Sequence, residues 1–415
     1  MPELFRESRC RACNGELDTF LSLGELYPSN FLRRDEFPRA RTPFDLCACV
    51  DCQMVQLRYT VDPDTMFRQY WYKSGINETM QHELADIVHR ASERVGLQRF
   101  DRIIDIGAND GTLLQNYPRS LSLLKVAFEP ALNLNEALHK HATIVVPDYF
   151  PQGLTHLENL ESRVKIITSI ACFYDLDQPK LFVEAIAKTL HPLGIWVVQF
   201  QDWDQMQKAT AFDNICMEHL VYYSLGSFER LIKPFGLQVV DAELRAVNGG
   251  SYRLYVGHRK GGWAVQPGVD ALRQHEAGCD AWDTFNKFAW RCQEAKKQIQ
   301  SAVGAMNRQH VQVDLYGAST KANTLLQWCG LTSGVIRQAW ERSSEKFDLR
   351  TVGTDIPIVP ETMGRADPPG ALLAGIWQFR DAILSREALY LQEGGSIIFP
   401  LPKVDIVSAR RGDAA

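Results

Sequence analysis

The chain has 415 residues, which at roughly 150 residues per domain suggests two or three domains. Its 45% hydrophobic and 23% charged residues are ordinary for a globular protein and exclude a fully disordered chain. Lys and Arg total 45 and Asp and Glu total 50, and this net charge of −5 disfavours a dedicated nucleic-acid binder, which would be basic. No apolar run approaches the roughly 18–20 residues that span a bilayer, and the charged N-terminus shows no secretory signal. We therefore expect a cytoplasmic protein that does not bind membranes.

The first 52 residues hold five of the ten cysteines. Two CxxC pairs, Cys10–Cys13 and Cys49–Cys52, predict a single four-cysteine site for Zn²⁺, because four thiolates satisfy a tetrahedral ion. Such a closed site is structural, and a short region with few large apolar side chains needs it to fold. The alternatives are four reduced cysteines, a redox motif of the thioredoxin kind, or Cys47 as a ligand in place of Cys49.

Between about residues 78 and 260, short β-rich runs alternate with helical or turn-like segments. This alternation predicts a parallel, doubly wound sheet. The predicted strands are Arg102–Ile106, Leu124–Phe128, Thr143–Val146, Val164–Ile170 and Ile195–Phe200. Leu237–Val240 and Tyr252–His258 are expected to add a closing antiparallel pair.

A polar, periodic stretch from Asp280 to Val303 predicts a helix that leads into a third region. This region alternates again up to about Val407, beginning with a strand at Val311–Tyr316 and a helix that starts near Lys321. The tail Ala409–Ala415 is expected to fray.

The sharpest motif is a glycine-rich turn, in the segment DRIIDIGANDGTLL of residues 101–114. The strand ends in Asp105, Gly107 and Gly111 bracket a tight loop, and a helix is expected to follow. Gly107 has no Cβ, so a ligand can approach the backbone closely, and Glu129 at the end of the next strand can bind both ribose hydroxyls. The spacing differs from the GxGxxG of a pyrophosphate site and favours S-adenosylmethionine. The alternatives are a turn that only packs a helix on the sheet, or a nicotinamide site.

Glu218 and His219 follow the last predicted parallel strand. A carboxylate and an imidazole at the carboxyl end of such a sheet are well placed to abstract a proton, although such a pair is often no more than surface charge. Cys216 would be a nucleophile only with an oxyanion turn, which the sequence does not show. Upstream, Tyr70 and Tyr72 predict either a sugar-facing loop or packing between domains.

A series of motifs covers nearly the whole chain, and their order is characteristic of one family. They are the two CxxC pairs with Tyr27–Asn30 between them, Met54–Leu57, the Tyr70–Ser74 run, IDIGANDGTLL, Glu218–His219, Asn248–Ser251, Tyr316–Lys321, Ile356–Glu361, Trp377–Arg380 and Gly394–Pro402. In this order the chain resembles the three-part, S-adenosylmethionine-dependent sugar C-methyltransferases that act on nucleotide-linked 4-keto-deoxysugars.

The resemblance implies an α/β fold in three parts. An N-terminal four-cysteine zinc-binding module would span residues 1–77, and a central Rossmann-like S-adenosylmethionine-binding methyltransferase domain residues 78–262. A second Rossmann-like α/β domain, which would bind the nucleotide sugar, would span residues 263–415. Members of the family often have Tyr-His where this chain has Cys216-Met217, and His at the positions near Tyr174-Asp175 and at Asn248. These departures bear on which sugar and nucleotide are bound.

The resemblance also implies roles for individual residues. His219 would be the general base, Glu218 would orient it or contact the sugar, and Tyr72 and Tyr70 would contact the 4-keto sugar. The implied cofactor-binding residues are Asp105, Gly107, Asn109, Asp110, Glu129 and Pro130. The implied substrate-binding residues are Asn214, Asn248, Ser319, Thr320 and Lys321. The zinc ligands would be Cys10, Cys13, Cys49 and Cys52.

The expected reaction is methylation of C3 of a GDP- or dTDP-linked 4-keto-6-deoxyhexose. The C4 ketone acidifies the C3 proton, because the carbanion delocalises as an enolate. The expected partner is this small molecule, with no nucleic acid, and the expected state is a monomer or weak homo-oligomer. Rival interpretations are a nucleotide-sugar O-methyltransferase, a zinc-ribbon RNA methyltransferase, and a non-catalytic nucleotide-sugar binding protein.

Overall fold

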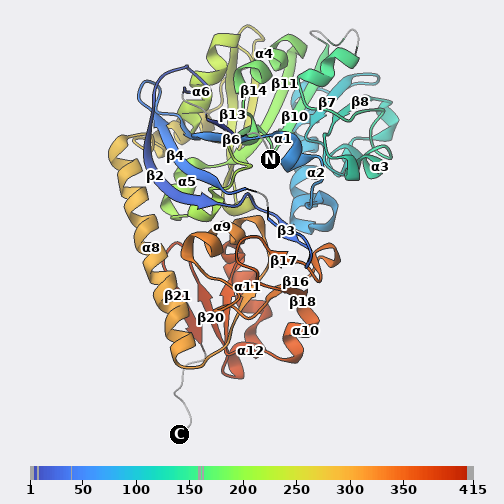
Figure 1. Cartoon of the computed structure of the whole chain (residues 1–415). Helices are drawn as coiled ribbons and strands as arrows, with labels where there is room; N and C mark the ends of the chain where they lie inside the picture. Colours follow the sequence, from blue (N-terminus) through green and yellow to red (C-terminus); the bar gives the residue numbers. More distant parts are fainter. Residues whose placement is uncertain (1–3, 7–8, 39, 158–159, 161–162, 409–415) are drawn as a thin grey trace.

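The computed structural model describes residues 4–6, 9–38, 40–157, 160 and 163–408. Two α/β bodies lie end to end, and the N-terminal strands lie against one side of both (Figure 1). The segment predicted to fray, Ala409–Ala415, is outside the described residues. Among the helices of the described ranges, none has the length and apolar character needed to cross a membrane.

The central sheet is doubly wound, as predicted, in the order β13-β14-β11-β10-β7-β8-β9. Its strands are β7 (Arg102–Ile106), β8 (Leu124–Phe128), β9 (Ile144–Val146), β10 (Val164–Ile170), β11 (Leu190–Gln201), β13 (Leu237–Arg245) and β14 (Ser251–His258). Neighbours from β9 to β11 pair in parallel, whereas β14 is antiparallel to both β11 and β13. The predicted strands and the closing antiparallel pair are confirmed.

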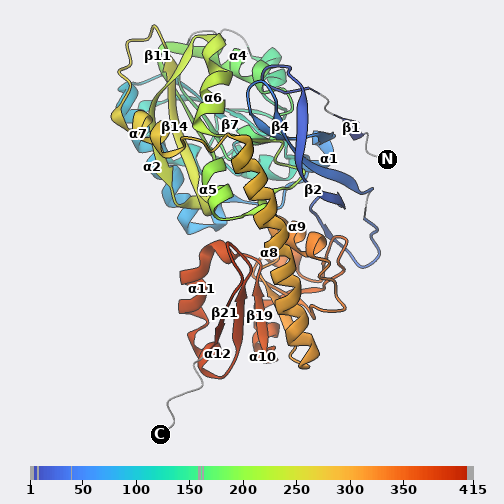
Figure 2. The same cartoon turned by 90° about the vertical axis from the view of Figure 1, so that its left-hand side faces the viewer.

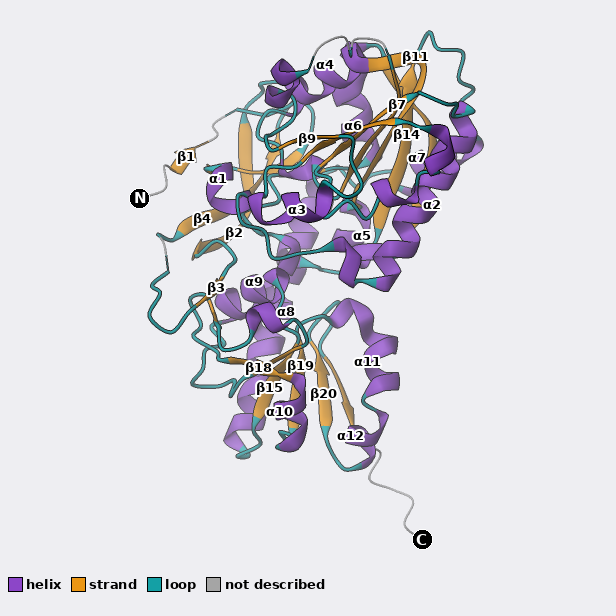
Figure 3. Cartoon of the chain, turned by 90° about the vertical axis from the view of Figure 1, so that its right-hand side faces the viewer, coloured by secondary structure: helices purple, strands orange, loops and turns teal. Residues whose placement is uncertain are grey.

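Helices cover both faces of the central sheet (Figure 3). They are α2 (Glu78–Val95), α3 (Asn135–Leu138), α4 (Pro179–Thr189), α5 (Trp203–Lys208), α6 (Leu225–Ile232) and α7 (Pro267–His275). The prediction of a helix directly after the glycine-rich turn is wrong, because the structure has a 3-10 turn there, at Leu114–Asn116. Pro118 explains the difference. The residue before a proline disfavours the α conformation, and the segment between Gly111 and Pro118 is too short for a helix.

The N-terminal region forms a small antiparallel sheet that includes a strand from the central region. Its order is β12-β5-β4-β2, with β2 at Leu17–Leu26, β4 at Thr42–Cys49, β5 at Val55–Leu57 and β12 at Val221–Tyr222. A second pair joins β1 (Leu4–Arg6) to β6 (Tyr59–Val61), and the short helix α1 (Pro63–Phe67) follows. Because β12 comes directly after Glu218-His219-Leu220, the N-terminal sheet holds one end of that segment.

The third region is a second α/β body, as predicted. Its sheet has the order β18-β16-β15-β19-β20-β21 and is parallel except for β21. The strands are β15 (Val313–Tyr316), β16 (Ala339–Glu341), β18 (Ile358–Pro360), β19 (Ala371–Ala374), β20 (Ser396–Phe399) and β21 (Asp405–Ser408). The helices are α9 (Thr320–Cys329), α10 (Glu361–Ala366), α11 (Arg380–Arg386) and α12 (Ala388–Gln392).

Long-range contacts join the three regions. The predicted polar helix is α8 (Trp282–Arg308), and it runs from the upper body along the side of the lower one (Figure 2). The strand β3 (Phe31–Leu32) pairs with β17 (Arg350–Thr351). One hydrophobic core continues from the N-terminal strands into the third sheet. These contacts cross between the regions and mark no boundary between domains. The predicted domain boundaries after residues 77 and 262 therefore stay predictions.

Candidate active site

The two CxxC pairs come together beside the N-terminal sheet. The four sulfurs of Cys10, Cys13, Cys49 and Cys52 lie within 4.8 Å of one another. The closest are Cys10 and Cys52, at 3.6 Å, and Cys13 and Cys49, at 3.4 Å. The backbone N–H of Gly15 donates to the Cys13 sulfur at 3.4 Å, a contact that favours the thiolate. Four thiolates at this spacing fit a tetrahedral Zn²⁺ with no position left for water, which is a structural site.

Cys47 is not part of this cluster. Its sulfur lies 3.2 Å from the Thr19 hydroxyl oxygen. The cluster consists of the four cysteines of the two CxxC pairs, with Cys49 and not Cys47 as its third member.

The glycine-rich turn forms one wall of a cavity of about 590 Å³, here called the first cavity. Gly107 has φ +68°, and a Cβ on it would lie 3.1 Å from the Cβ of Cys172, so both conformation and space require glycine. The N–H groups of Gly107 and Ala108 donate to the carbonyl of Phe128, at 2.9 and 3.1 Å, which fixes the turn against β8. Asp105 lies behind it and accepts a hydrogen bond of 2.6 Å from Thr168. Burial, together with the charge of Glu129, raises the pKa of Asp105 to about 7.

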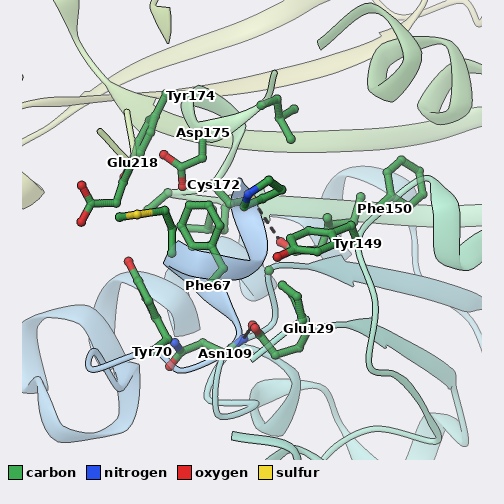
Figure 4. Close-up of a pocket in the computed structure, with 18 of the residues that line it drawn as sticks. Phe67, Tyr70, Asn109, Glu129, Tyr149, Phe150, Cys172, Tyr174, Asp175 and Glu218 are labelled. Atoms are coloured by element: carbon green, nitrogen blue, oxygen red, sulfur yellow. Dashed lines mark hydrogen bonds between the residues drawn. The ribbon is translucent and has the colours of Figure 1, made fainter. Parts of the chain in front are cut away.

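Glu129 is placed where a ribose-binding carboxylate was predicted, directly after β8. One of its oxygens accepts from the N–H of Ala131 at 2.8 Å, and the other from the N–H of Asn109 at 2.7 Å. These bonds fix the carboxylate but leave each oxygen further lone pairs for a ligand hydroxyl. Burial raises the pKa of Glu129. Figure 4 shows Glu129 and Asn109 side by side at one end of the first cavity, which Pro130 also lines.

Asn109 and Asp110 bind the glycine-rich turn to the aromatic segment at residues 70–75. The Asn109 side chain accepts from the N–H of Ser74 at 2.9 Å and donates to the carbonyl of Tyr72 at 3.0 Å. Asp110 accepts from the N–H of Gly75 at 2.8 Å. Asn109 lines the first cavity, whereas Asp110 is not among the described residues that line it. The two loops therefore form one structural unit.

His219 lies in the first cavity with one ring nitrogen occupied. Its Nδ1 is 3.1 Å from the carbonyl oxygen of Asn214, and because a carbonyl only accepts, Nδ1 carries the proton and Nε2 is the basic atom. The ring of Tyr174 packs edge-on against the imidazole, with centroids 4.4 Å apart. Removal from water, with the charge of Lys321, lowers the pKa of His219 to about 3. The imidazole is therefore neutral near pH 7.

Two carboxyl groups from different elements line the same cavity as this imidazole. Glu218 is buried, and Asp175 follows β10 in the 3-10 turn Phe173–Asp175. One oxygen of each has no hydrogen-bond partner among the described residues. Burial raises the pKa of Glu218 to about 7, and burial with the charge of Glu218 raises the pKa of Asp175. Figure 4 shows both carboxyls, with Tyr174, at the end of the cavity opposite Glu129.

Asp175 was not among the predicted site residues. The signal that identifies it is its position in the turn that follows a parallel strand, at the sheet edge where ligands bind.

Tyr70 and Tyr72 both line the first cavity. The Tyr70 hydroxyl points toward the Glu218 end, as Figure 4 shows. Burial and nearby carboxylates raise the pKa of Tyr70, and burial raises the pKa of Tyr72 to about 12, so both hydroxyls are protonated donors near pH 7. Tyr72 is 40% exposed, which places it at the mouth of the cavity.

A second cavity of about 870 Å³ adjoins the first and shares Tyr70, Tyr72, Glu218 and Thr320 with it. Ser319 lines this second cavity and caps α9, its hydroxyl accepting from the N–H of Ala322 at 3.0 Å. Lys321 lines the first cavity instead.

Two other predicted substrate-binding residues lie elsewhere. Asn214 is not among the described lining residues of either cavity, and its carbonyl holds His219. Asn248 is in the 3-10 turn Val247–Gly249, and its side chain lies outside what the structure describes.

Comparisons with known proteins agree with this three-part arrangement. Residues 10–67 match the family model of a zinc binding domain, residues 76–242 a methyltransferase domain, and residues 246–402 the C-methyltransferase C-terminal domain. The chain is 26% identical over 407 residues to C-methyltransferase NovU of Streptomyces niveus, which covers 96% of this chain and 97% of NovU.

Two solved methyltransferase structures align with less than half of this chain. An S-adenosylmethionine-dependent methyltransferase from Clostridium acetobutylicum aligns at 11% identity and TM-score 0.33, over 43% of this chain and 92% of the other. Magnesium protoporphyrin IX methyltransferase from Synechocystis, solved with bound S-adenosylmethionine, aligns at 7% identity and TM-score 0.32, over 42% and 77%. The strand order of the central sheet, and not these alignments, identifies the fold.

Proposed function

We propose that this chain, which belongs to the S-adenosylmethionine-dependent C-methyltransferases, methylates C3 of a nucleotide-linked 4-keto-6-deoxyhexose. The observation that carries the proposal is the geometry of His219, a neutral imidazole with a basic Nε2 in the same cavity as the glycine-rich turn. A carbon acid such as a proton beside a ketone needs such a base, because carbon gives up a proton only when the resulting charge is delocalised.

The glycine-rich turn and Glu129 are the residues that would hold the cofactor. S-adenosylmethionine, when bound, supplies an electrophilic methyl group. The two fixed oxygens of Glu129 suit the ribose hydroxyls, and the acidic groups around the turn suit a cationic ligand. The bonds from Asn109 to Ser74 and Tyr72 would transmit the position of this turn to the aromatic segment.

His219 would take the C3 proton on Nε2 while the Asn214 carbonyl holds Nδ1–H. The imidazolium that forms would lie beside the negative charge developing on the sugar, which offsets the unfavourable pKa of the resting imidazole. The protonated hydroxyl of Tyr70 points toward the Glu218 end of the cavity and can donate to a sugar oxygen. The carbon nucleophile would then attack the methyl group in line, so the positioning of both molecules supplies much of the rate.

The second cavity suits the nucleotide diphosphate. Arg41, Arg68 and Lys346 line it together with acidic side chains, whereas Lys321 is the one lysine or arginine among the described residues that line the first cavity. Ser319 and Thr320 lie at the start of α9, where backbone N–H groups and the helix dipole favour an anion. In this arrangement the sugar spans the junction of the cavities, between Glu218 and Thr320.

The test is to incubate the enzyme with S-adenosylmethionine and either GDP- or dTDP-4-keto-6-deoxyhexose, and to analyse the product by mass spectrometry and NMR. Parallel samples in D₂O without the cofactor report exchange of the C3 proton. We expect one added methyl group on C3 and C3 exchange with one of the two nucleotides. A methyl group on oxygen would identify an O-methyltransferase. No product and no exchange with either sugar would contradict the proposal, and binding of RNA in a gel shift would then be measured.

A further inference from the structure

Lys321 is the second residue of α9, and its side chain reaches from the third region into the first cavity. Of the described residues that line this cavity, it is the one with a lysine or arginine side chain. The same lining includes Asp105, Glu129, Asp175 and Glu218. A negative charge that develops on a substrate here therefore has one cationic side chain to meet it.

The helix that carries Lys321 is fixed to the segment that carries His219. The buried Thr324 hydroxyl donates to the carbonyl of Ile215 at 3.1 Å. One turn further on, the ring of Trp328 packs edge-on against Phe212, with centroids 4.6 Å apart. The short 3-10 turn Phe212–Asn214 therefore packs against α9, and this packing joins the helix that carries Lys321 to the segment that carries His219.

Asp213 is a buried carboxylate whose charge acts on Lys321. It is fully buried and accepts from the indole of Trp377 at 2.8 Å and from the amide of Gln378 at 3.3 Å. Its negative charge opposes the effect of burial, which lowers the pKa of Lys321. Lys321 in turn helps to lower the pKa of His219. The carboxylate, ammonium and imidazole thus interact at one wall of the cavity.

We propose that the Lys321 ammonium binds the C4 ketone oxygen of the sugar and stabilises the negative charge that forms on it when His219 removes the C3 proton. In this step the C3–H bond breaks and its proton goes to Nε2 of His219. The electron pair forms the C3–C4 double bond, and the carbonyl π electrons move to the oxygen, which accepts a hydrogen bond from Lys321. When C3 attacks the methyl group, the bond between that carbon and the sulfonium sulfur breaks and its electron pair stays on the sulfur of the departing S-adenosylhomocysteine. The carbonyl re-forms, and His219 then releases its proton to water. This inference rests on the proposed function and makes Lys321 a catalytic residue.

The alternative role, binding of a phosphate group, fits the position of Lys321 less well. The second cavity has its own basic residues and includes Ser319, whereas Lys321 is not among its described lining residues.

The experiment measures C3 exchange in D₂O at saturating keto sugar, without cofactor, for the wild type, Lys321→Met and Lys321→Ala. Lys297→Met is the matched control, because Lys297 lies on the surface of α8 in an ion pair with Glu294. Calorimetry gives the Kd of S-adenosylmethionine and of GDP and dTDP for each protein. Ethylamine is added to Lys321→Ala to replace the missing ammonium.

We expect Lys321→Met to lower the saturated exchange rate by about 10²–10³-fold, the loss seen when one oxyanion donor is removed. The three Kd values should not change, and ethylamine should restore part of the rate of Lys321→Ala. Unchanged exchange at saturation, or a loss confined to the nucleotide Kd, would overturn the inference. Loss of cofactor binding in both variants would also overturn it, by making Lys321 structural. Absence of exchange in the wild type itself would instead refute the proposed function.

Discussion

At the scale of single residues, His219 is the group whose removal should abolish proton abstraction. His219→Asn and His219→Ala should lower C3 exchange and methyl transfer by about 10²–10⁴-fold, the contribution typical of a positioned base. Binding of S-adenosylmethionine should be retained, because Glu129 and the glycine-rich turn remain intact. The measurements are exchange by NMR and binding by calorimetry. His89→Ala is the control, since His89 is exposed on α2. Near wild-type turnover in the His219 variants would contradict the assignment.

Because Glu218 is buried, the stability of the protein should fall as the pH rises. Burial raises its pKa from 4.5 to about 7, so the folded protein holds a proton there that the unfolded chain releases above pH 4.5. The stability that this proton contributes is complete below pH 4.5 and is lost as the pH rises through about 7. Above that pH, wild-type Glu218 keeps a buried charge that a glutamine would not.

Glu218→Gln should therefore become more stable relative to wild type between pH 5 and pH 8. At about 1.4 kcal/mol for each pH unit between the two pKa values, the change in relative unfolding free energy is about 3 kcal/mol. Urea denaturation at the two pH values measures it. The control is Glu184→Gln, because Glu184 is exposed on α4 beside Lys188. Parallel stability curves for Glu218→Gln and wild type would show that Glu218 is not protonated in the native state.

At the scale of elements, the glycine-rich turn and the aromatic segment 70–75 should act as one unit. Asn109 has φ +51°, so Asn109→Gly keeps the backbone conformation while it removes the bonds to Ser74 and Tyr72. Two lost hydrogen bonds should raise both the Kd of S-adenosylmethionine and the KM of the keto sugar, each by about tenfold. Calorimetry and steady-state kinetics measure the two. Ser122→Gly is the control, because Ser122 has a similar φ of +47° but lies on the surface. A change in the cofactor Kd alone would show that the two loops are independent.

The elements that the sequence predicts well are those whose signal is local. The strands β7, β8 and β10 are short apolar runs that the sheet buries on both faces, and their bounds agree with the prediction. The strand β12 has two residues and pairs with β5 far away in the sequence, so no local pattern marks it. The pairing of CxxC with CxxC was also predictable, because zinc chemistry requires four ligands.

The sequence allowed several residues of the site to be predicted, but not the contacts that those residues make in the fold. The order of Glu218 and His219 after a strand is visible in the sequence, whereas the contact of His219 with the Asn214 carbonyl depends on the fold of a loop. Asp110 and Asn214 were predicted to bind ligands, and the bonds they make in the structure hold Gly75 and His219. The approach of Lys321 to His219 depends on the docking of α9, which a sequence pattern does not encode.

At the scale of the whole molecule, each region supplies something that the first cavity needs. The N-terminal sheet holds β12, the central sheet carries the glycine-rich turn, and the third region contributes α9. Figures 1 and 2 both show α9 at the place where the lower body meets the rest of the chain. The amide of Gln327 on α9 also exchanges two hydrogen bonds with the backbone of Tyr27, at 2.8 and 3.1 Å. The three regions should therefore be required together for activity.

The zinc site can affect catalysis only through this shared architecture, because none of the four cysteines is among the described residues that line either cavity. The link is Arg11, the buried residue inside the first CxxC pair. Its guanidinium donates to the Leu57 carbonyl and the Thr60 hydroxyl, both at 2.7 Å, and pairs with Asp177 at 3.2 Å. Thr60 and Asp177 line the first cavity. A metal bound by the four cysteines would therefore order a loop whose Arg11 side chain contacts two residues of the cavity wall.

Removal of zinc by a chelator, or Cys49→Ser, should lower Tm by about 10 °C or more and reduce turnover in proportion to the zinc lost, because metal binding supplies folding free energy to this module. Metal analysis, calorimetric unfolding and the methylation assay measure the three quantities. Co²⁺ should restore both stability and turnover, since any tetrahedral thiolate-bound ion can order the loop. Arg11→Ala should keep one zinc per chain yet lose part of the turnover. This result would distinguish the effect of the Arg11 contacts from the effect of metal loss. Full turnover of the zinc-free protein would refute this coupling, and turnover that changed with the identity of the metal at constant stability would point to a direct role for zinc in the reaction.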